Sequence, residues 1–386
     1  MSTGAAALAA VFGYGCLAAA IAGCVFTLME CIFVLRFSLT REAAAAGAVA
    51  QPAVTILKPL HGAEPNLMER LRLLCRQDYT GAVQIVLGTQ RDGDAVAVIA
   101  SRLKAEFPDQ VIDLVIDPRS HGSNRKVANL INMMPSAGHD ILVLADSDIV
   151  VGPDYLRKLV AILATPGVGA ATCLYFGLGG NFWSRLAALA INSHFLPQAV
   201  AAATFDIGSY CGGATIALRR SVLERIGGFP AFADVLADDY AIGAAVRTLG
   251  EGVALAPFAV GHCCFESDLR QVVLHQLRVA RTIRSIEPLG YAGTLVTHPL
   301  PLALLAVLTG SMAAVWVTAA ALICRLALYW CVTWRFDVSR RDFWLLPVQD
   351  LLAFAIYVMS FAGGGVHWRG QEYRVAADGT LIERGT

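Results

Sequence analysis

The chain has 386 residues, of which 56% are hydrophobic and only 16% are charged. Soluble globular proteins are about 45–50% apolar and about 25% charged, so this composition predicts segments that enter a membrane. The 30 basic and 30 acidic residues cancel, and the sequence contains no basic block of the kind that binds nucleic acid. We therefore expect a membrane protein with no nucleic-acid partner.

Residues 5–35 are almost wholly apolar and contain one charge, Glu30. A membrane-spanning helix needs about 20 apolar residues, and the segment lacks the basic start and short apolar core of a cleaved secretory signal. It is therefore expected to be a retained transmembrane anchor. Arg36 and Arg41 follow it, and because basic residues favour the cytoplasmic side, they predict a cytoplasmic domain behind the anchor.

Residues 52–298 have the pattern of that domain. Short β-rich runs occur at 54–57, 83–88, 111–116 and 141–145, with helical stretches such as 65–77 and 94–107 between them. This alternation predicts an α/β fold with a mostly parallel sheet and helices on both faces. In such sheets ligands bind beyond the carboxyl ends of the strands.

Further apolar segments follow the four runs. Residues 181–205 are interrupted by Asn192, His194 and Pro197, so we expect a helix that lies on the membrane surface. Residues 299–366 are expected to hold the C-terminal transmembrane segments. They comprise a tract at 299–333, either a helical hairpin or one long tilted helix, and a second tract at 343–362. Residues 367–386 form a polar tail.

Basic residues on both sides of the 343–362 tract make its topology ambiguous. Arg335, Arg340 and Arg341 precede the tract, and Arg369, Arg374 and Arg384 follow it. Both of its ends therefore have a cytoplasmic signature. A helix that crosses once would put its ends on opposite sides, so the sequence leaves the C-terminal topology open.

The strongest chemical motif is Asp146-Ser147-Asp148, directly after the run 141–145. Two carboxylates at i and i+2 on a turn can both face a hard divalent cation such as Mg²⁺ or Mn²⁺, which commonly bridges phosphates. The alternative is an Asx turn that ends a strand. After a buried β-run in a membrane protein, the metal and diphosphate interpretation is the one we favour.

A second acidic motif is Asp238-Asp239-Tyr240, which precedes a helical stretch at 241–249. Either aspartate can be a helix N-cap. The functional interpretation is a general base that takes a proton from an acceptor hydroxyl, and an adjacent like charge raises the pKa of such a carboxyl. We assign the base to Asp239, with Asp238 as a capping or supporting residue.

Basic and polar residues provide further candidates. Arg278 and Arg281 share one face of a helix and can grip phosphate, or they can extend to the membrane surface. Lys126 and Asn129 can reach a nucleotide, or they can simply begin a helix. His194 is either an ordinary histidine of the membrane surface or a contact to the nucleotide sugar.

Cysteine offers little chemistry in this sequence. The ten cysteines have no CxxC spacing and are expected to be free and buried. His262-Cys263-Cys264 contains residue types that bind metals. Adjacent ligands do not converge easily on one tetrahedral ion, however, so the sequence does not favour a metal site there.

The motifs in their order resemble the ceramide glucosyltransferase family of inverting GT-A enzymes, whose bacterial members include glycosyltransferases of hopanoid biosynthesis. The matching segments are VTILKPLHG (54–62), QDY (77–79), SNRKVANL (123–130), DSDI (146–149), CGGATIALRRSVLERIGGF (211–229), LADDY (236–240) and HQLRVART (275–282). The resemblance implies a GT-A domain, a UDP-sugar donor, a divalent metal and a lipid acceptor with a primary hydroxyl. It implies that Asp146 and Asp148 hold the metal and diphosphate, that Asp239 is the base, and that Arg278 belongs to a (Q/R)xxRW motif.

Two departures from the family pattern concern the donor. His275 and Val279 stand at the first and last positions of (Q/R)xxRW, so the tryptophan is absent. The family's early aspartate motif corresponds here to Gln90-Arg91-Asp92-Gly93-Asp94. Asp92 and Asp94 are both candidates for the carboxylate on the uracil side.

Together these features predict a membrane-bound glycosyltransferase of GT-A type, integral to a membrane that we expect to be the bacterial inner membrane. The expected reaction transfers a hexose from a UDP-sugar to a lipid hydroxyl, with inversion and most consistently with a ceramide-like acceptor. Alternatives are hexosyl or N-acetylglucosaminyl transfer to a hopanoid polyol, a polysaccharide synthase, and a non-catalytic carrier. A carrier would hold ionisable residues inside its spans, whereas nearly all acids here lie outside them.

Overall fold

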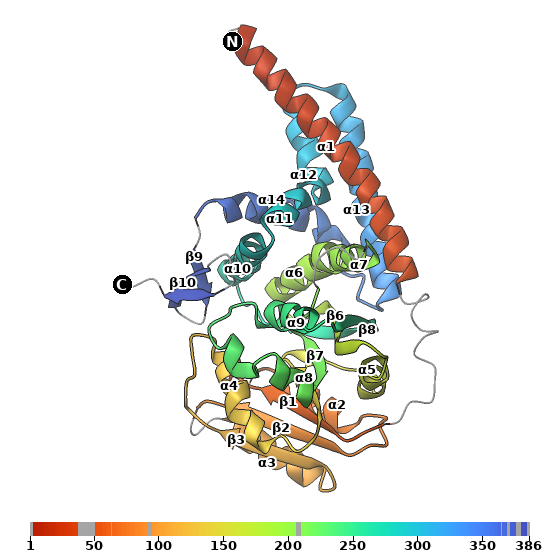
Figure 1. Ribbon diagram of the computed structural model, residues 1–386. Coiled ribbons are helices and arrows are strands. Elements are labelled where there is room, and N and C mark those ends of the chain that lie inside the picture. The colour runs from red at the N-terminus through yellow and green to blue at the C-terminus, as the bar shows by residue number, and fades with distance from the viewer. Residues whose placement is uncertain are drawn as a thin grey trace.

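The computed structural model describes residues 3–37, 51–62, 64–91, 95–205, 210–363, 365–368, 371–375 and 380–383. Asp92, Asp94, Arg41 and much of the polar tail lie outside these residues. The chain forms an α/β domain at one end and a bundle of apolar helices at the other (Figure 1).

An eight-stranded sheet forms the centre of the α/β domain, in the order β3-β2-β1-β4-β7-β6-β8-β5. Its strands are β1 (Val54–Pro59), β2 (Val83–Thr89), β3 (Val111–Ile116), β4 (Ile141–Ala145), β5 (Ile149–Val150), β6 (Val168–Gly179), β7 (Thr215–Arg219) and β8 (Gly252–Cys264). Only β7 and β5 run against the others. The predicted α/β fold is confirmed, and the four predicted runs are β1 to β4. Strands β5 to β8 lie outside the four predicted runs.

Alternating burial explains why these runs form strands. Ile56 and Leu57 are neighbours on β1, and both are fully buried, but they join different cores on opposite faces of the sheet. Side chains alternate across a strand, so an apolar run of this kind is stable only between two layers of helices. Those helices are α2 (Leu67–Cys75), α3 (Ala95–Glu106), α4 (Arg125–Met133), α5 (Tyr155–Leu163), α8 (Arg220–Arg225) and α9 (Asp238–Thr248).

The apolar segment 181–205 is one interrupted helix. It consists of α6 (Phe182–Ala190), a π-helical turn η3 (Ile191–Phe195) and α7 (Leu196–Phe205). The side chain of Asn192 accepts from Gly177 N at 2.7 Å and donates to Gly177 O at 3.0 Å, which fastens the π turn to β6. The polar residue that interrupts the sequence pattern therefore anchors the helix to the sheet.

Five helices complete the membrane side: α10 (Leu269–Ile286), α11 (Pro288–Gly293), α12 (Pro299–Val307), α13 (Met312–Arg335) and α14 (Leu346–Phe361). They join α1 (Thr3–Arg36). The tract 299–333 is thus a helical hairpin, one of the two forms that the sequence allowed. A small sheet of β9 (Gly365–Trp368), β10 (Gln371–Val375) and β11 (Leu381–Glu383) follows α14.

Four helical segments among the described residues are long and apolar enough to cross a membrane: Ala7–Arg36, Phe182–Phe205, Met312–Arg335 and Phe343–Phe361. Large apolar side chains on α1 and α13, such as Phe12 and Trp316, are exposed. Such a surface fits contact with lipid. The chain therefore has the helices of a membrane protein.

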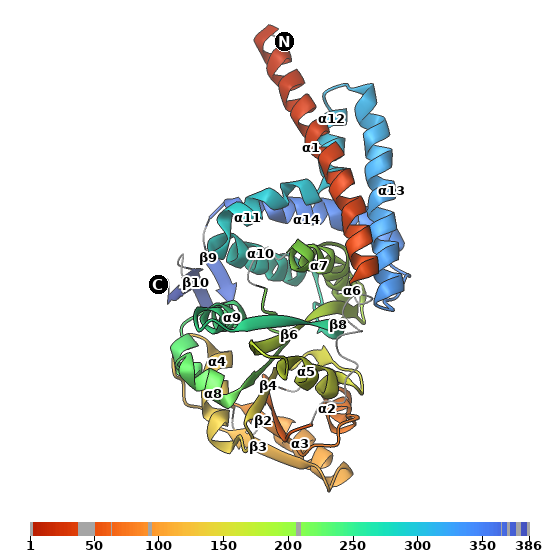
Figure 2. The same cartoon turned by 45° about the vertical axis from the view of Figure 1, so that its right-hand side comes forward.

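The direction of α14 bears on the open topology of the C-terminal part. In both views α1, α12 and α13 run together away from the sheet, whereas α14 runs across the base of that bundle (Figures 1 and 2). One side of α14 packs on α10 through Ile356 and Tyr357, and Val348 and Leu351 on another side are exposed. A helix with this distribution suits the plane of the membrane surface.

We therefore expect both ends of α14 to lie on the same side of the membrane as the α/β domain. Arg340→Cys and Ala362→Cys should react with a membrane-impermeant maleimide from the side that labels Asp78→Cys, which is exposed on the α/β domain. Leu308→Cys, in the turn between α12 and α13, should be labelled from the opposite side. Labelling of position 362 together with position 308 would show that α14 crosses.

Candidate active site

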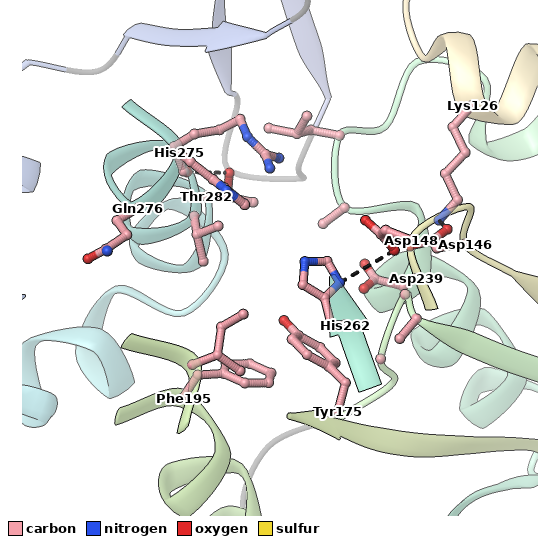
Figure 3. A pocket seen from close by; sticks show the side chains of 18 of the residues that line it. Lys126, Asp146, Asp148, Tyr175, Phe195, Asp239, His262, His275, Gln276 and Thr282 are labelled. Carbon is pink, nitrogen blue, oxygen red and sulfur yellow. Dashed lines mark hydrogen bonds and ion pairs between the residues drawn. The ribbon is translucent and has the colours of Figure 1, made fainter. Parts of the chain in front are cut away.

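A cavity of about 1300 Å³ lies between the sheet and the membrane-side helices. Its walls include Asp146, Asp148 and Asp239 from the α/β domain, and Arg278 and His298 from the other side. Figure 3 shows the acidic groups and Lys126 together on one side, with Gln276 and Thr282 of α10 on the opposite side. Most of the candidate residues predicted from the sequence therefore line one space.

The acidic triplet is held firmly at the end of β4. Asp146 N donates to Ala214 O at 3.2 Å, and Cys263 N donates to Asp148 O at 2.9 Å. Lys58, fully buried on β1, donates to Asp146 O. Burial lowers the pKa of Lys58 to about 8, although Asp148 opposes that shift. These bonds hold the main chain of the triplet without using its carboxylates, and both aspartates line the cavity.

Lys126 connects the two acidic motifs. Its Nζ lies 2.8 Å from Asp146 Oδ1 and 3.3 Å from Asp238 Oδ2. Burial alone would lower the pKa of Lys126, but the surrounding carboxylates outweigh it and raise the pKa. Lys126 is positioned because Asn124 caps α4, accepting from Lys126 N at 3.0 Å and Val127 N at 3.1 Å.

Asp238 and Asp239 lie in the first turn of α9, which begins three residues earlier than the sequence pattern indicated. The N-cap position belongs to Ala237, so neither aspartate is the cap. Asp238 instead pairs with Lys126, which leaves Asp239 to face the cavity. A Cβ on Gly213 would lie 2.8 Å from Asp239 Oδ2, so this glycine allows the carboxylate its position.

Asp239 has the electrostatics of a general base. Burial and the neighbouring Asp238 raise its pKa to about 6, with Lys126 opposing the shift. A carboxylate with a pKa near the working pH is suited to accept a proton.

His262 on β8 faces Asp148, with Nδ1 3.4 Å from Oδ1 (Figure 3). Asp148 Oδ1 is buried and accepts no hydrogen bond of normal geometry from the described residues. Burial would raise the pKa of Asp148, but His262 and Lys58 lower it to about 2. An ionised carboxylate oxygen and an imidazole nitrogen at this spacing are a suitable start for a divalent metal site.

The rest of such a site must come from elsewhere. Within the described residues, no three His, Cys, Asp or Glu side chains form a ready-made metal cluster. Magnesium and manganese commonly complete their shells with water and substrate phosphates. The two side chains therefore fit a metal that arrives with a nucleotide diphosphate.

The two arginines of α10 are in different environments. Arg278 lines the cavity, and no hydrogen bond from its guanidinium to the described residues is present. Arg281 donates to Gly365 O and to Ala362 O, the latter at 2.8 Å. Arg281 therefore holds the segment after α14, while Arg278 remains the candidate for an anionic ligand.

The remaining predicted residues divide between the two ends of the cavity. Asn129 Nδ2 donates to Gly88 O at 2.9 Å, and its buried Oδ1 has no hydrogen-bond partner among the described residues. His194 lies at the other end, beside Asp350 of α14 and Arg325 of α13. The side chain of His194 is therefore bonded to groups of the membrane-side helices and not to Asp146, Asp148 or Asp239.

Several residues of the cavity were not predicted. His262 was discounted together with the adjacent cysteines, although its imidazole pairs with the Asp148 carboxylate without them. Lys58 could have been suspected as a charge inside an apolar β-run. Tyr175, which lies 5.2 Å from the His262 ring and stacks on Phe195 at 4.7 Å, carried no signal in the sequence.

Comparison with known families identifies the class of this site. A model described as Glycosyl transferase family 21 matches residues 15–381. The chain belongs to glycosyl transferase family 21 and is an enzyme that transfers a sugar. This confirms the resemblance drawn from the motifs and the fold class that it implied.

Two curated relatives give the range of similarity. Ceramide glucosyltransferase 1 of Caenorhabditis elegans is 23% identical over 222 residues, which are 53% of this chain and 44% of the relative. An N-acetylglucosaminyltransferase of Rhizobium leguminosarum bv. viciae is 31% identical over 121 residues, 31% of this chain and 27% of the relative. The matches thus span less than half of either relative.

Solved structures are more distant. The mannosyltransferase PcManGT from Pyrobaculum calidifontis, in complex with GDP-Man and Mn²⁺, has a TM-score of 0.47 and 20% identity, and the match covers 90% of this chain and 99% of that one. Glucosyl-3-phosphoglycerate synthase from Mycobacterium tuberculosis, in complex with Mn²⁺ and UDP-Glc, has a TM-score of 0.35 and 16% identity, and the match covers 63% of this chain and 80% of that one.

If Asp148 and His262 bind a metal, then Asp148→Asn and His262→Ala should each weaken Mn²⁺ binding by at least about tenfold. Electron paramagnetic resonance of free Mn²⁺ during titration of the purified protein with UDP present measures this affinity. His139→Ala is the control, since His139 Nδ1 lies 3.1 Å from Thr55 Oγ1 at the opposite end of the strands. Equal Mn²⁺ binding in all three variants and the unmodified protein would remove this pair from the metal site.

Proposed function

We propose that this enzyme transfers a hexose from a UDP-sugar to the hydroxyl of a membrane lipid, with inversion at the anomeric carbon. The proposal rests on one continuous cavity. Its acidic end is compatible with a metal, and its other end is formed by membrane-side helices. A soluble nucleotide sugar can enter at one end and a lipid at the other. The ceramide-like acceptor is favoured over a hopanoid polyol because ceramide glucosyltransferases are among the relatives.

The charged residues at one end of the cavity are assigned to binding of the UDP-sugar donor. Asp148 and His262 would hold Mg²⁺ or Mn²⁺, with Asp146 on the diphosphate side and Lys126 keeping Asp146 in position. The metal, when bound, supplies positive charge for the diphosphate leaving group. Arg278 adds a guanidinium that is free to bind phosphate oxygens. Lys126 and Asn129 lie where the nucleotide enters, and Asp92 and Asp94 remain candidates for the uracil side.

Asp239 is assigned as the base that activates the lipid acceptor. This carboxylate takes the proton from the lipid hydroxyl as the oxygen attacks the anomeric carbon. Lys126 neutralises Asp238 beside it, so Asp239 can ionise near neutral pH. Attack from the side opposite to the departing diphosphate inverts the anomeric configuration.

The orientation follows from the same arrangement. Arg36 ends α1 next to the α/β domain, and Arg335 ends α13 at the same level. Basic residues at these ends favour a cytoplasmic α/β domain, where UDP-sugars would be supplied. In a bacterium this membrane would be the inner membrane.

The sugar itself has a second candidate. The relatives from Rhizobium leguminosarum and Sinorhizobium fredii are N-acetylglucosaminyltransferases. Val279 replaces the family tryptophan in the wall of the cavity, which leaves more space than an indole would. N-acetylhexosamine transfer is therefore the alternative to hexose transfer.

Asp239→Asn should lower lipid glycosylation by about 10²–10⁴-fold because the amide cannot accept the proton, while UDP-sugar binding persists. Mass spectrometry of lipids from a host without glycolipids, expressing either form, measures this. A new hexosyl or N-acetylhexosaminyl lipid seen only with the unmodified protein establishes the reaction and the sugar class. Normal product from the variant would exclude Asp239 as the base.

The pH profile tests the same assignment independently. Asp239 must be ionised to accept a proton, and burial raises its pKa to about 6. The transfer rate at subsaturating acceptor should therefore fall about tenfold per pH unit below that value and level off above it. Asp239→Glu should shift the midpoint in any residual activity. A rate that stays constant from about pH 5 to 7 would contradict the assignment.

A further inference from the structure

A buried ionic cluster lies at the membrane end of the cavity. Arg325 of α13 and Asp350 of α14 have side chains only 2% exposed and 2.8 Å apart. His194, in the π turn η3, contacts both. The cluster ties three helices together, and His194 is its member on the cavity wall. A buried ion pair often contributes little net stability. The pair can instead act on His194, which both of its members contact.

The hydrogen atoms on Nε and Nη2 of Arg325 are committed to other groups. Its Nε donates to Asp350 Oδ2 at 2.9 Å, and Nη2 donates to Asp350 Oδ1 and to Ser193 O, both at 2.8 Å. Nη2 carries two hydrogen atoms, and these two bonds use them. His194 Nε2, 2.9 Å from Nη2, therefore receives no hydrogen from Arg325.

The distance from His194 to Asp350 then selects the tautomer. Nε2 lies 3.0 Å from Asp350 Oδ1. Two lone pairs facing each other at this distance would repel, so Nε2 carries the hydrogen and donates it to the carboxylate. In the neutral ring Nδ1 then has no hydrogen and is a hydrogen-bond acceptor.

Nδ1 of His194 has no partner among the described residues, although it is buried. The same is true of Nδ1 of His298, a residue that is 6% exposed and whose ring lies 5.4 Å from that of His194. Both histidines line the cavity. A buried polar atom without a partner costs about 1–3 kcal/mol, so a ligand that donates a hydrogen bond here would offset a cost already present.

We propose that His194 Nδ1 accepts a hydrogen bond from the headgroup of the acceptor lipid, and that Arg325 and Asp350 are positioning residues that fix its tautomer. This inference rests on the proposed lipid glycosylation. The reacting hydroxyl gives its proton to Asp239, on the other wall of the cavity. The group at His194 is therefore a second donor, such as an amide N–H or another hydroxyl.

The geometry thus defines a class of acceptor lipid. A lipid with a hydroxyl and a second donor beside it, as in an N-acylated aminodiol, can satisfy Asp239 and His194 together. A diacylglycerol has one hydroxyl and no other donor, so it leaves His194 unpaired. Discrimination between these lipids should depend on residue 194.

Two variants of His194 test the site in the full-length protein in nanodiscs, with UDP-glucose as donor. His194→Leu removes the acceptor atom, whereas His194→Asn keeps an oxygen near the position of Nδ1. We expect His194→Leu to raise KM for ceramide by about 5–150-fold and to leave KM for UDP-glucose and for diacylglycerol unchanged. His194→Asn should remain close to the unmodified protein. Equal effects on both lipids, or none, would overturn the proposal.

Binding separates this proposal from the proposed reaction. Fluorescent ceramide is titrated into the protein with UDP present. Weaker binding by His194→Leu supports the acceptor site even if no sugar is transferred, in which case only the reaction fails. No ceramide binding by the unmodified protein would overturn the acceptor site as well.

The positioning residues are tested as a pair. Arg325→Met or Asp350→Leu alone leaves a buried charge without its partner, so each single variant risks misfolding. Arg325→Met/Asp350→Leu removes both charges, a change that is often neutral for stability. The double variant should fold and lose the preference for ceramide over diacylglycerol.

The matched control is Arg185→Met/Asp342→Leu. Arg185 Nε donates to Asp342 at 2.9 Å between α6 and the segment before α14, without touching His194. A change in the ratio of the two KM values confined to the Arg325/Asp350 pair supports positioning. An unchanged ratio in both double variants would assign Arg325 and Asp350 a purely structural role.

Discussion

The ammonium of Lys126, held between Asp146 and Asp238, organises the polar end of the cavity. Three aspartates from two elements converge there, and without a cation between them their mutual repulsion would oppose folding. Because Lys126 lies near the start of α4, the cap that Asn124 provides also sets the position of this charge. Lys126, in the first turn of α4, therefore connects the end of β4 to the start of α9. Asp239 is left without an ion-pair partner of its own in the part of the chain that the structure describes.

The membrane bundle completes the cavity from the other side. Strand β6 and helix α7 pack against α1 and α13 in a core that includes Leu174, Val200 and Leu328. Neither part encloses the cavity alone, since α10 and α14 supply the wall opposite the aspartates. The Arg281 bonds to the segment after α14 hold this wall in place. Both parts of the chain are therefore needed to form the cavity.

The features that could be predicted from the sequence are those determined by residues close together in the chain. The strands β1 to β4 follow from apolar runs with turns between them, and Asp146, Asp148 and Asp239 follow from their places after a strand and beside a helix. The pairing of Asp148 with His262 is not local, because it depends on β8 lying beside β5. Likewise, Arg278 and Arg281 share a helix face, and only the position of α14 separates their roles.

The polar residues of the apolar segment 181–205 have specific partners in the fold. Asn192 and His194 weaken the pattern of a membrane span, and from sequence alone they look like interruptions. In the fold Asn192 binds the backbone of β6, while His194 meets an ion pair on α13 and α14. Ionisable and polar groups at membrane depth are costly and persist where partners or ligands satisfy them. The nitrogen of His194 that remains unsatisfied is therefore the atom at which a ligand is most expected.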